Sequence, residues 1–415
     1  MLRPGHVVIL CALALLSIGL VMVTSAGLTV EPVETLPVGD ALAAVPVPPD
    51  STTHSVTHSL FRVATSRPAI YMALAVAALI AGSLLPIRAL ADRFSSAPTT
   101  SRGPLLFLAL GTGLILAVVA TSFIPGLGRV VNGSARWVRI PMLGGLSFQP
   151  SELAKWGLAL LIAIYAASQR HLMHRFWLGL VPGLLAAGII VAAVALEDLG
   201  TGVLIGLVAC TVLLAAGARL WHFLAFIPPA AAGFVVLVLS NPYRLTRLQT
   251  FLDPYADPKK TGYHMIQSLG AVANGEGFGR GLGFGLQKFG YLPEDTTDFL
   301  FAIICEELGI AGAAVVVSLY AALLFAAVVV IRRTESLLLK LITLGIITTV
   351  GVQALVNLAV VTGLAPTKGI ALPLVSAGGT GWILTAFCLG IVVAIDRAAP
   401  RNEPEQSHTP HPSLA

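Results

Sequence analysis

Charged side chains are scarce in this sequence: Asp, Glu, Lys and Arg make up only 11% of its 415 residues, against roughly 25% in soluble domains. Hydrophobic residues account for 56%. So few charges cannot cover a large soluble domain, which excludes a soluble enzyme of this size. The composition predicts a polytopic membrane protein. The net charge of +5 must then be assigned to sides of the membrane, and it does not indicate binding to nucleic acid.

Cysteine is also rare, and none of the four cysteines is placed for a disulfide or a metal. They lie far apart in apolar runs, with no CxxC pair and no Cys/His ligand spacing. Free cysteines in such positions behave as small buried hydrophobic residues. The sequence therefore predicts no metal-ligating residues.

Long apolar runs dominate what is present. A bilayer core about 30 Å thick is crossed by about 20 apolar residues in a helix. We take the first run as a retained helix, because it is longer than the core of a usual signal peptide. The predicted fold class is an all-α polytopic membrane protein with about ten transmembrane helices and a large extracytoplasmic loop between the seventh and the eighth. The expected spans are about 6–27, 69–90, 104–124, 152–168, 176–196, 200–217, 222–240, 308–331, 340–362 and 378–396.

One membrane domain over residues 1–398 accounts for all of these spans. Residues 28–68 are rich in Pro, Ala, Val, Ser and Thr and are expected to form a flexible outer loop, and residues 399–415 have the composition of a disordered tail. Lys and Arg are denser in the loops that share a side with the N-terminus. Because positive residues collect in cytoplasmic loops, both termini are expected in the cytoplasm.

The one long polar interval, residues 241–307, separates the seventh span from the eighth. It holds eight of the twenty acidic residues and six of the twenty-five basic ones, and the expected orientation places it outside. We interpret it as a catalytic outer loop that ends in the start of the eighth helix. Its segment HMIQSLGAVANG is expected to form a short amphipathic helix. The glycine repeat GEGFGRGLGFG could bring backbone amides and Arg280 to a phosphate, although glycine repeats also make plain loops.

Acidic residues crowd the point where this interval re-enters the membrane. Asp298 directly precedes FLFAII, and Glu306 and Glu307 lie further inside the apolar run. Carboxylates at this depth are expected to face a watery or protein-lined cavity. Partial burial would raise the pKa of the Asp298 carboxyl and make it a better proton acceptor near neutral pH. A helix N-cap is the structural alternative for Asp298.

The loop before the fourth span carries a second group of candidates. Arg136 and Trp137 precede a helix start at Pro150. Glu152 and Lys155 lie three residues apart, so they share one face of that helix. A surface ion pair with an interfacial tryptophan is the alternative.

Two shorter loops add further polar residues. In LEDLGTG, a helix N-cap for the sixth span is the leading explanation for Asp198, with a substrate or cation contact as the alternative. The last outer loop, TGLAPTKGIALPLVSAGGTGW, contains Ser376 and a single charge, Lys368. Lys368 is well placed to meet an anion, or else it anchors the loop at the interface.

Several of these segments, taken in order, resemble the SEDS family (shape, elongation, division and sporulation), whose members include FtsW and RodA. The resemblance covers nearly all ten spans, and PTKG, QKFGYLPE and FLDPxxDP are closer to the FtsW branch. The matching segments are FQPSELAK, LEDLGTG, FLDPYADPKKTGYHMIQSL, GFGLQKFGYLPEDTTDFLFAIICEELG and LAPTKGIALPLVSAGGTGW.

The resemblance implies a peptidoglycan glycosyltransferase that polymerises lipid II at the outer face of the bacterial cytoplasmic membrane. It also implies a class B penicillin-binding protein as partner, with other division-complex proteins for a division enzyme. The family's essential Asp in TDF falls on Asp298, its Glu and Lys in QPSExxK on Glu152 and Lys155, its Trp on Trp137, and its PTxG loop on 366–369. We therefore take Asp298 as the candidate catalytic residue. The candidate substrate-binding residues are Trp137, Arg136, Glu152, Lys155, Lys368 and Ser376.

The chain departs from the family pattern at four points. The family usually has a His between its Glu and TDF, where this chain has Asp295 and Thr296 after Glu294, and LEDLGT replaces QPDLGT. His264 follows Tyr263 where the family has Gln, and Ala377 stands where it has Tyr. The extra carboxylate at Asp295 would raise the pKa of the Asp298 carboxyl further.

The expected reaction is glycosyl transfer with inversion. Asp298 would take the proton of the attacking hydroxyl, and cations would stabilise the departing diphosphate; a divalent Mg or Mn ion is a candidate cofactor. The alternative from another class is a flippase or transporter of a lipid-linked precursor, which ten spans with intramembrane acids also fit. Against it, the charges gather at one face rather than at the midplane. A non-catalytic division scaffold is the third possibility.

Overall fold

The computed structural model describes residues 3–26, 66–95, 103–124, 128–131, 134–139, 147–287, 296–377 and 379–399. The expected loop 28–68 and the expected tail 399–415 lie almost wholly outside these ranges, as do residues 288–295 of the polar interval.

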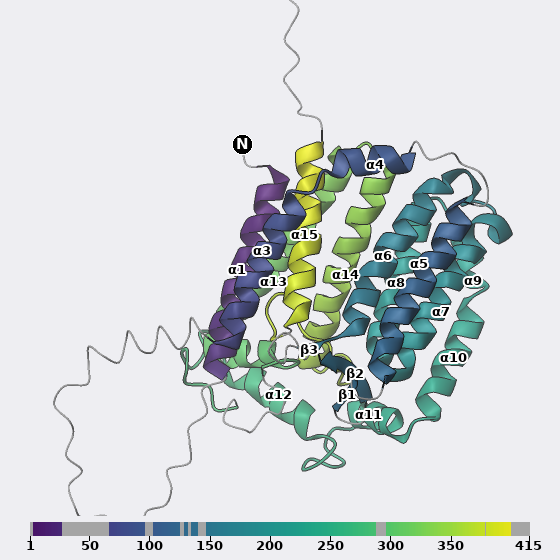
Figure 1. Cartoon of the computed structure of the whole chain (residues 1–415). Helices are drawn as coiled ribbons and strands as arrows, with labels where there is room; N and C mark the ends of the chain where they lie inside the picture. The colour runs from purple at the N-terminus through teal and green to yellow at the C-terminus, as the bar shows by residue number, and fades with distance from the viewer. Residues whose placement is uncertain are drawn as a thin grey trace, which may run out of the picture.

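The described residues form a bundle of helices (Figure 1). Eight candidate spans are long and apolar enough to cross a membrane, and two shorter apolar helices, α3 and α8, complete a set of ten. Each expected span corresponds to one of them, which confirms the predicted fold class. The spans are α1 (Pro4–Ala26), α3 (Arg67–Ser83), α5 (Gly103–Ala120) with η1 (Thr121–Phe123), α6 (Pro150–Ser168), η4 (Phe176–Leu180) with α7 (Val181–Glu197), α8 (Leu199–Ala215), α9 (Leu220–Leu224) with α10 (Ile227–Leu239), α13 (Leu300–Arg333), α14 (Leu337–Val361) and α15 (Thr380–Ala398).

Shorter helices cap the two ends of the bundle. At one end, α4 (Ile87–Ser95) follows α3, and η3 (Arg170–Leu172) follows α6; at the other end lie α11 (Pro242–Leu252) and α12 (Tyr263–Asn274). The expected second span, 69–90, is too long at its C-terminal end. Pro86 has no N–H to continue the helix, so α3 stops before it and the chain turns into α4. The expected amphipathic helix after His264 is confirmed as α12.

Glycine lets α3 and α15 pack closely, side by side in Figure 1. A Cβ on Gly82 would lie 2.3 Å from the carbonyl oxygen of Phe387, and a Cβ on Gly390 would lie 2.3 Å from that of Leu79. Backbones that approach this closely exclude any side chain at the crossing. Small residues are the usual means of close helix packing in membranes, where dispersion contacts replace the hydrophobic effect.

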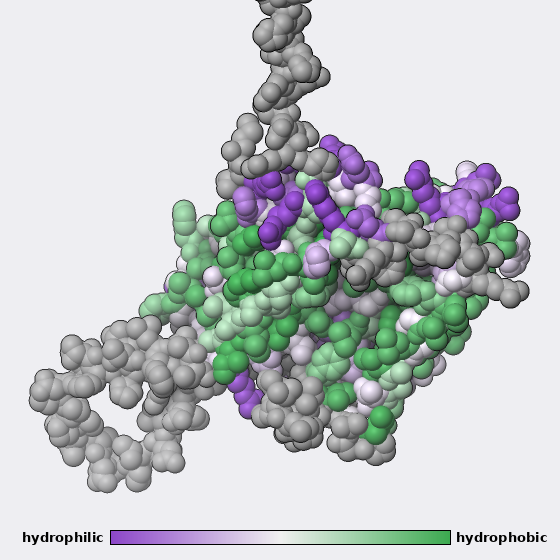
Figure 2. All heavy atoms as spheres, turned by 45° about the horizontal axis from the view of Figure 1, so that its top comes forward, coloured by the Kyte–Doolittle hydropathy of each residue, from purple (hydrophilic) through white to green (hydrophobic). Residues whose placement is uncertain are grey.

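Both ends of the described chain lie at the same end of the bundle, the upper one in Figure 1. The Gly5 N–H donates to Oδ2 of Asp396 at 3.0 Å, so the last turn of α15 caps the first turn of α1. Arg170, Arg175 and Arg332 are exposed at this end. Figure 2 turns it forward and shows hydrophilic side chains gathered there above a hydrophobic surface.

α13 starts earlier than expected and is broken. It begins at Leu300 rather than near residue 308, and Gly309 interrupts it with φ 65° and ψ −163°. The residues before the break include Glu306 and Glu307, which are fully buried. Positive φ is open to glycine without strain, so Gly309 permits the break.

A small antiparallel sheet, which the sequence analysis did not predict, lies between α5 and α6. Its strands are β1 (Gly128–Val131), β2 (Ser134–Arg139) and β3 (Ser147–Phe148), in the order β1-β2-β3. A signal was present, because the Asn-Gly pair at 132–133 between short apolar runs is typical of a hairpin. The sheet leads the chain from β3 directly into α6.

Candidate functional site

The candidate residues gather at the end of the bundle opposite to the termini, the lower end of Figure 1. The loop after α14 meets the starts of α6, α8 and α13 there. Residues 367–371 of this loop are called the 367–371 segment. The segment lies directly against the start of α8 and against Asp298, just before α13. It is linked to the start of α6 through Gln353, which bonds both the segment and Lys155. This segment connects the predicted site residues.

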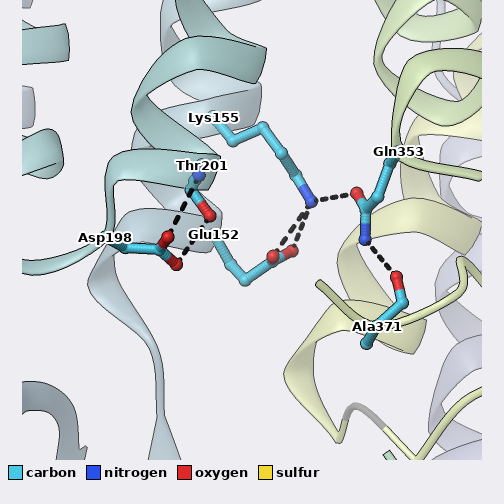
Figure 3. A network of polar contacts seen from close by, with 6 residues as sticks. All are labelled: Glu152, Lys155, Asp198, Thr201, Gln353 and Ala371. Carbon is cyan, nitrogen blue, oxygen red and sulfur yellow. Dashed lines mark hydrogen bonds and ion pairs between the residues drawn. The ribbon is translucent and has the colours of Figure 1, made fainter. Parts of the chain in front are cut away.

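Glu152 and Lys155 form an ion pair at the start of α6, as predicted from their spacing. Pro150 and Glu152 lie in the first turn, where proline has no N–H to lose and a carboxylate faces the positive helix end. Nζ of Lys155 donates to the two carboxylate oxygens of Glu152 at 2.9 and 2.8 Å, and to Oε1 of Gln353 at 2.8 Å (Figure 3). The pair therefore bridges α6 and α14.

The ammonium of Lys155 is sequestered by this arrangement. Its side chain is 2% exposed and that of Glu152 is 17% exposed. An ammonium has three N–H donors, and these contacts engage all of them. A buried charge is tolerated only when it is paired and hydrogen-bonded. An anionic ligand would therefore reach Lys155 only by displacing one of its present partners.

Asp298 lies against the 367–371 segment. It is half-buried, and a Cβ built on Gly369 would lie 3.0 Å from its Oδ2. Its backbone carbonyl accepts a hydrogen bond from Nδ2 of Asn357 at 2.8 Å. The N-cap residue assigned to α13 is Phe299, directly after Asp298.

Lys368 lies over the start of α8. A Cβ on Gly200 would be 2.8 Å from Cδ and 3.1 Å from Nζ of Lys368. Asp198 caps this helix, as its leading interpretation predicted: it accepts from the Thr201 N–H at 3.1 Å and from the Thr201 hydroxyl at 2.9 Å (Figure 3). The fold thus brings LEDLGTG and the PTKG loop together.

Three residues that the sequence analysis missed hold the 367–371 segment. Arg247 donates from Nη1 to the carbonyl oxygen of Thr367 at 3.0 Å and stacks on the Tyr243 ring, 4.5 Å from its centroid. Gln353 and Asn357 donate to the carbonyls of the last two residues of the segment, Ala371 and Ile370. A signal for the two amides was available, because polar residues inside an apolar span are functional candidates by default.

Trp137 and Arg136 lie on β2, which pairs with β3 just ahead of α6. Trp137 is half-buried and lies opposite Arg129 in the register. The Arg136 side chain falls outside the described part of the structure. The sheet therefore places both residues near the start of the helix that carries Glu152.

Ser376 has a different place from the one expected. It is fully buried; its hydroxyl accepts the Leu372 N–H at 3.0 Å, and its carbonyl accepts from Nε1 of Trp382 at 2.6 Å. These bonds close the turn that leads into α15. The hydroxyl is not open to a ligand in this structure, so we leave Ser376 out of the proposed substrate contacts.

The glycine repeat is not an open phosphate cradle. The N–H groups of Arg280 and Gly281 donate to the carbonyls of Glu306 and Glu307, both at 2.9 Å. The Glu306 carboxylate accepts the N–H groups of Leu286 and Gln287 at 3.0 and 3.1 Å. The repeat is therefore tied to the first part of α13, and the buried acids are lined by protein. These bonds occupy amides that a phosphate would have needed.

No cluster of three or more His, Cys, Asp or Glu side chains occurs in the part of the chain that the structure describes. A cavity of about 790 Å³ lies at the other end of α14, where Leu337 and Leu338 line it together with Arg88 and Glu335. It is separate from the cluster around Asp298.

Comparison with known proteins gives a family and close relatives. The FtsW/RodA/SpoVE family, described as "Cell cycle protein", matches residues 52–400. A probable peptidoglycan glycosyltransferase FtsW of a Geobacter species is 38% identical over 289 residues, 69% of this chain and 77% of the relative. Stage V sporulation protein E of Bacillus subtilis is 38% identical over 278 residues, 66% of this chain and 74% of the relative.

Solved structures share the fold. One, described as "Structural coordination of polymerization and crosslinking by a peptidoglycan synthase complex", has a chain that aligns with a TM-score of 0.67 and 23% identity over 94% of this chain and 97% of that one. The rod shape determining protein RodA of Thermus thermophilus aligns with a TM-score of 0.58 and 22% identity over 95% and 97%. At these identities the structures establish the fold alone.

Proposed function

Because this chain belongs to the FtsW/RodA/SpoVE family of cell cycle proteins, we propose that it is a peptidoglycan glycosyltransferase that polymerises lipid II into glycan strands. The observation that carries the proposal is the contact between Asp298 and the 367–371 segment, in which Gly369 packs against the carboxylate and Lys368 directly precedes Gly369. Sugar transfer from a lipid diphosphate needs a proton acceptor and a positive charge for the leaving group. These residues supply both.

Asp298 is the proposed general base. It accepts the proton of the acceptor sugar's 4-hydroxyl as that oxygen attacks the anomeric carbon of the donor. The new carbon–oxygen bond forms while the bond from the anomeric carbon to the diphosphate oxygen breaks, and the electron pair leaves with the diphosphate. Attack from the side opposite to the leaving group inverts the anomeric centre. Diphosphate leaves readily, so the step needs no second carboxyl as an acid, unlike glycoside hydrolysis.

Lys368 is the proposed contact for the developing charge on the diphosphate. Lys155 acts first on Glu152, which it holds in one orientation at the start of α6. Glu152 is the more exposed member of that pair and is the proposed acceptor for a substrate hydroxyl or amide. Trp137 and Arg136, carried by β2, are proposed to contact the sugar and the diphosphate. No step is routed through a metal ion.

The protein is a multi-pass membrane protein, and we propose that its site faces away from the cytoplasm. The support is the exposed arginine-rich end of the bundle, which carries both described ends of the chain. Cytoplasmic loops are enriched in Lys and Arg, and Asp298 lies at the opposite end. The cytoplasmic membrane of a bacterium is the proposed location.

A cross-linking enzyme is the proposed partner. The structural neighbour belongs to a complex described as coordinating polymerization and crosslinking. We propose a class B penicillin-binding protein in that role here, with a place in cell division alongside other division-complex proteins, since curated relatives are named FtsW and stage V sporulation protein E.

Asp298→Asn tests the base role. The purified protein and its partner transpeptidase would receive lipid II, and glycan strands would be measured by gel separation. The expected result is loss of polymer from a variant that elutes and unfolds like the wild type. Glu335→Gln is the matched control, because Glu335 is exposed at the other end of the bundle. Polymer from folded Asp298→Asn would reject the base role, and lipid II translocation in liposomes without polymer would favour the flippase.

A further inference from the structure

Two amide side chains on α14 link the two halves of the candidate site. Gln353 and Asn357 lie four residues apart, so they occupy the same face of the helix one turn from each other. Their side chains are 8% and 1% exposed. Burying two amides within an apolar span is unfavourable unless they make hydrogen bonds.

Each amide joins one candidate group to the 367–371 segment. Oε1 of Gln353 accepts from Nζ of Lys155 at 2.8 Å, and its Nε2 donates to the carbonyl of Ala371 at 2.8 Å (Figure 3). Nδ2 of Asn357 donates to the carbonyls of Asp298 and Ile370, both at 2.8 Å. One helix face therefore holds the Glu152–Lys155 pair, Asp298 and the loop between them.

The chemistry of the neighbours fixes how both amides point. Turning the Gln353 amide over would set its NH₂ against the Lys155 ammonium, and turning the Asn357 amide over would set its oxygen against two carbonyl oxygens. Either change replaces attraction with repulsion. The Asn357 Oδ1 has no hydrogen-bond partner among the described residues. Asn357 therefore donates two hydrogen bonds from Nδ2, to the carbonyls of Asp298 and Ile370, while its Oδ1 accepts none from the described residues.

We propose that Gln353 and Asn357 are positioning residues, which set the separation and orientation of Asp298 relative to the Glu152–Lys155 pair. This inference rests on the proposed glycosyl transfer. Neither amide is exposed enough to contact the sugars, so both act through the residues they hold. Misplacing a reacting group by about 1 Å can cost about 100-fold in rate.

The test is the kinetics of Asn357→Leu and Gln353→Met in polymer formation from lipid II, with the partner transpeptidase present. Leu approximates the volume of Asn but donates no hydrogen bond, and Met does the same for Gln. An interaction that orders only the reacting geometry lowers kcat and leaves KM nearly unchanged. We expect kcat to fall by about 10- to 100-fold in each variant. Because both side chains act on one segment, the double variant should lose less than the product of the single effects.

Thr349→Val is the control on the same helix. Thr349 is fully buried, and the one bond its hydroxyl makes to described residues is to the Gly345 carbonyl of its own helix, at 2.7 Å. The Thr349→Val variant should keep the wild-type kcat. Gln353→Glu is the conservative variant, because it keeps an acceptor for Lys155 and loses the donor to Ala371. Its kcat should lie between that of Gln353→Met and that of the wild type.

The outcomes separate this inference from the proposed function. Wild-type kcat in folded Asn357→Leu and Gln353→Met, with polymer lost in Asp298→Asn, would overturn the positioning role and leave the function standing. Activity that falls only in proportion to the folded fraction would also overturn it, because the amides would then serve stability alone. If Asn357→Leu does not fold, the kcat and KM of Gln353→Met decide. A wild-type complex that makes no polymer would overturn the function and this inference together.

Discussion

Gly369 shows how a single residue limits what Asp298 can do. A methyl group there would begin 3.0 Å from Oδ2 of Asp298, closer than nearly all real Cβ contacts. Gly369 is itself exposed, in the middle of the 367–371 segment. Bulk at this position would displace the carboxylate while leaving the core of the bundle untouched.

Gly369→Ala is therefore expected to reduce polymer formation by about 10-fold, through displacement of the carboxylate by a few tenths of an ångström. The measurement is the initial rate with lipid II and the partner transpeptidase, together with the thermal midpoint in detergent. Gly188→Ala is the matched control, since a Cβ on Gly188 meets nothing within 4 Å. A Gly369→Ala protein with the wild-type rate would show that the carboxylate has room to spare.

The ion pair at the start of α6 predicts an unequal pair of stability losses. Glu152→Gln leaves the Lys155 ammonium, 2% exposed, without its counter-charge. Breaking a buried pair in this way costs about 3–5 kcal/mol. Lys155→Met leaves the Glu152 carboxylate without its counter-charge. Because Glu152 is more exposed, water solvates this carboxylate and the loss of stability is smaller.

The thermal midpoint in detergent is thus expected to be highest for the wild type, lower for Lys155→Met and lowest for Glu152→Gln. The double variant should recover part of the loss of Glu152→Gln, because it removes both charges together. A Lys155→Met protein that is the least stable of the three, or a double variant with strictly additive losses, would contradict the burial argument.

Local rules were enough to predict the residues that act within one element. Helix spacing joined Glu152 to Lys155, and the preference of acids for helix starts explained Asp198. The contacts of Asp298 with Gly369 and of Lys155 with Gln353 join distant parts of the chain. No single-sequence rule gives such pairings. The bond from the Leu372 N–H to the Ser376 hydroxyl is likewise visible only in the folded turn.

At the scale of elements, the break in α13 depends on the glycine repeat. The N–H groups of Ile310 and Ala311 donate to the carbonyls of Glu276 and Gly277 at 3.0 and 3.2 Å, so the repeat supplies bonds to the interrupted helix. A Cβ on Gly309 would lie 2.4 Å from the backbone nitrogen of Gly279. The broken helix and the loop therefore form one unit.

Gly309→Ala should prevent this unit from forming and lower the yield of folded protein sharply. Two effects add: backbone at φ 65° and ψ −163° costs a residue with a Cβ about 1–3 kcal/mol, and the methyl group collides with the loop backbone. Gly283→Ala isolates the first effect, since Gly283 also has positive φ, 86°, but a Cβ there meets nothing within 4 Å. Detergent-stable yield and thermal midpoint would be compared. If yield and thermal midpoint fall equally in Gly309→Ala and Gly283→Ala, the collision between the methyl group and the loop backbone does not contribute.

The elements found from the sequence are those whose signal is local. Span length and composition identified a helix for every expected span, because crossing a bilayer imposes the same requirement on each. The expected span 308–331 is shorter than α13, because it left out the turns that contain Glu306 and Glu307; these acids were expected in the start of the eighth helix, at the end of the polar interval. The sheet was missed because each strand is short and is stabilised by hydrogen bonds to a neighbouring strand, which the residues of one strand do not reveal.

At the scale of the whole molecule, the fold separates two kinds of surface. Arg170, Arg175 and Arg332 are exposed at the end with both described chain ends, and α11, α12 and the candidate site lie at the other. Positive residues are retained in the cytoplasm during insertion. The asymmetry therefore predicts an orientation as well as a fold.

Substituted-cysteine labelling in intact cells tests that orientation. Tyr255 is 68% exposed at the end that carries the candidate site, and His174 is exposed at the arginine-rich end. Cys11, Cys305 and Cys388 are buried and Cys210 is partly buried, so the native background should be low, and a parallel measurement on the wild type corrects for it. A membrane-impermeant maleimide, applied to cells whose outer barrier has been opened, should label Tyr255→Cys at once and His174→Cys only after the membrane is disrupted. The reverse pattern would place Asp298 on the cytoplasmic side, where a polymerase of exported lipid II would have no substrate.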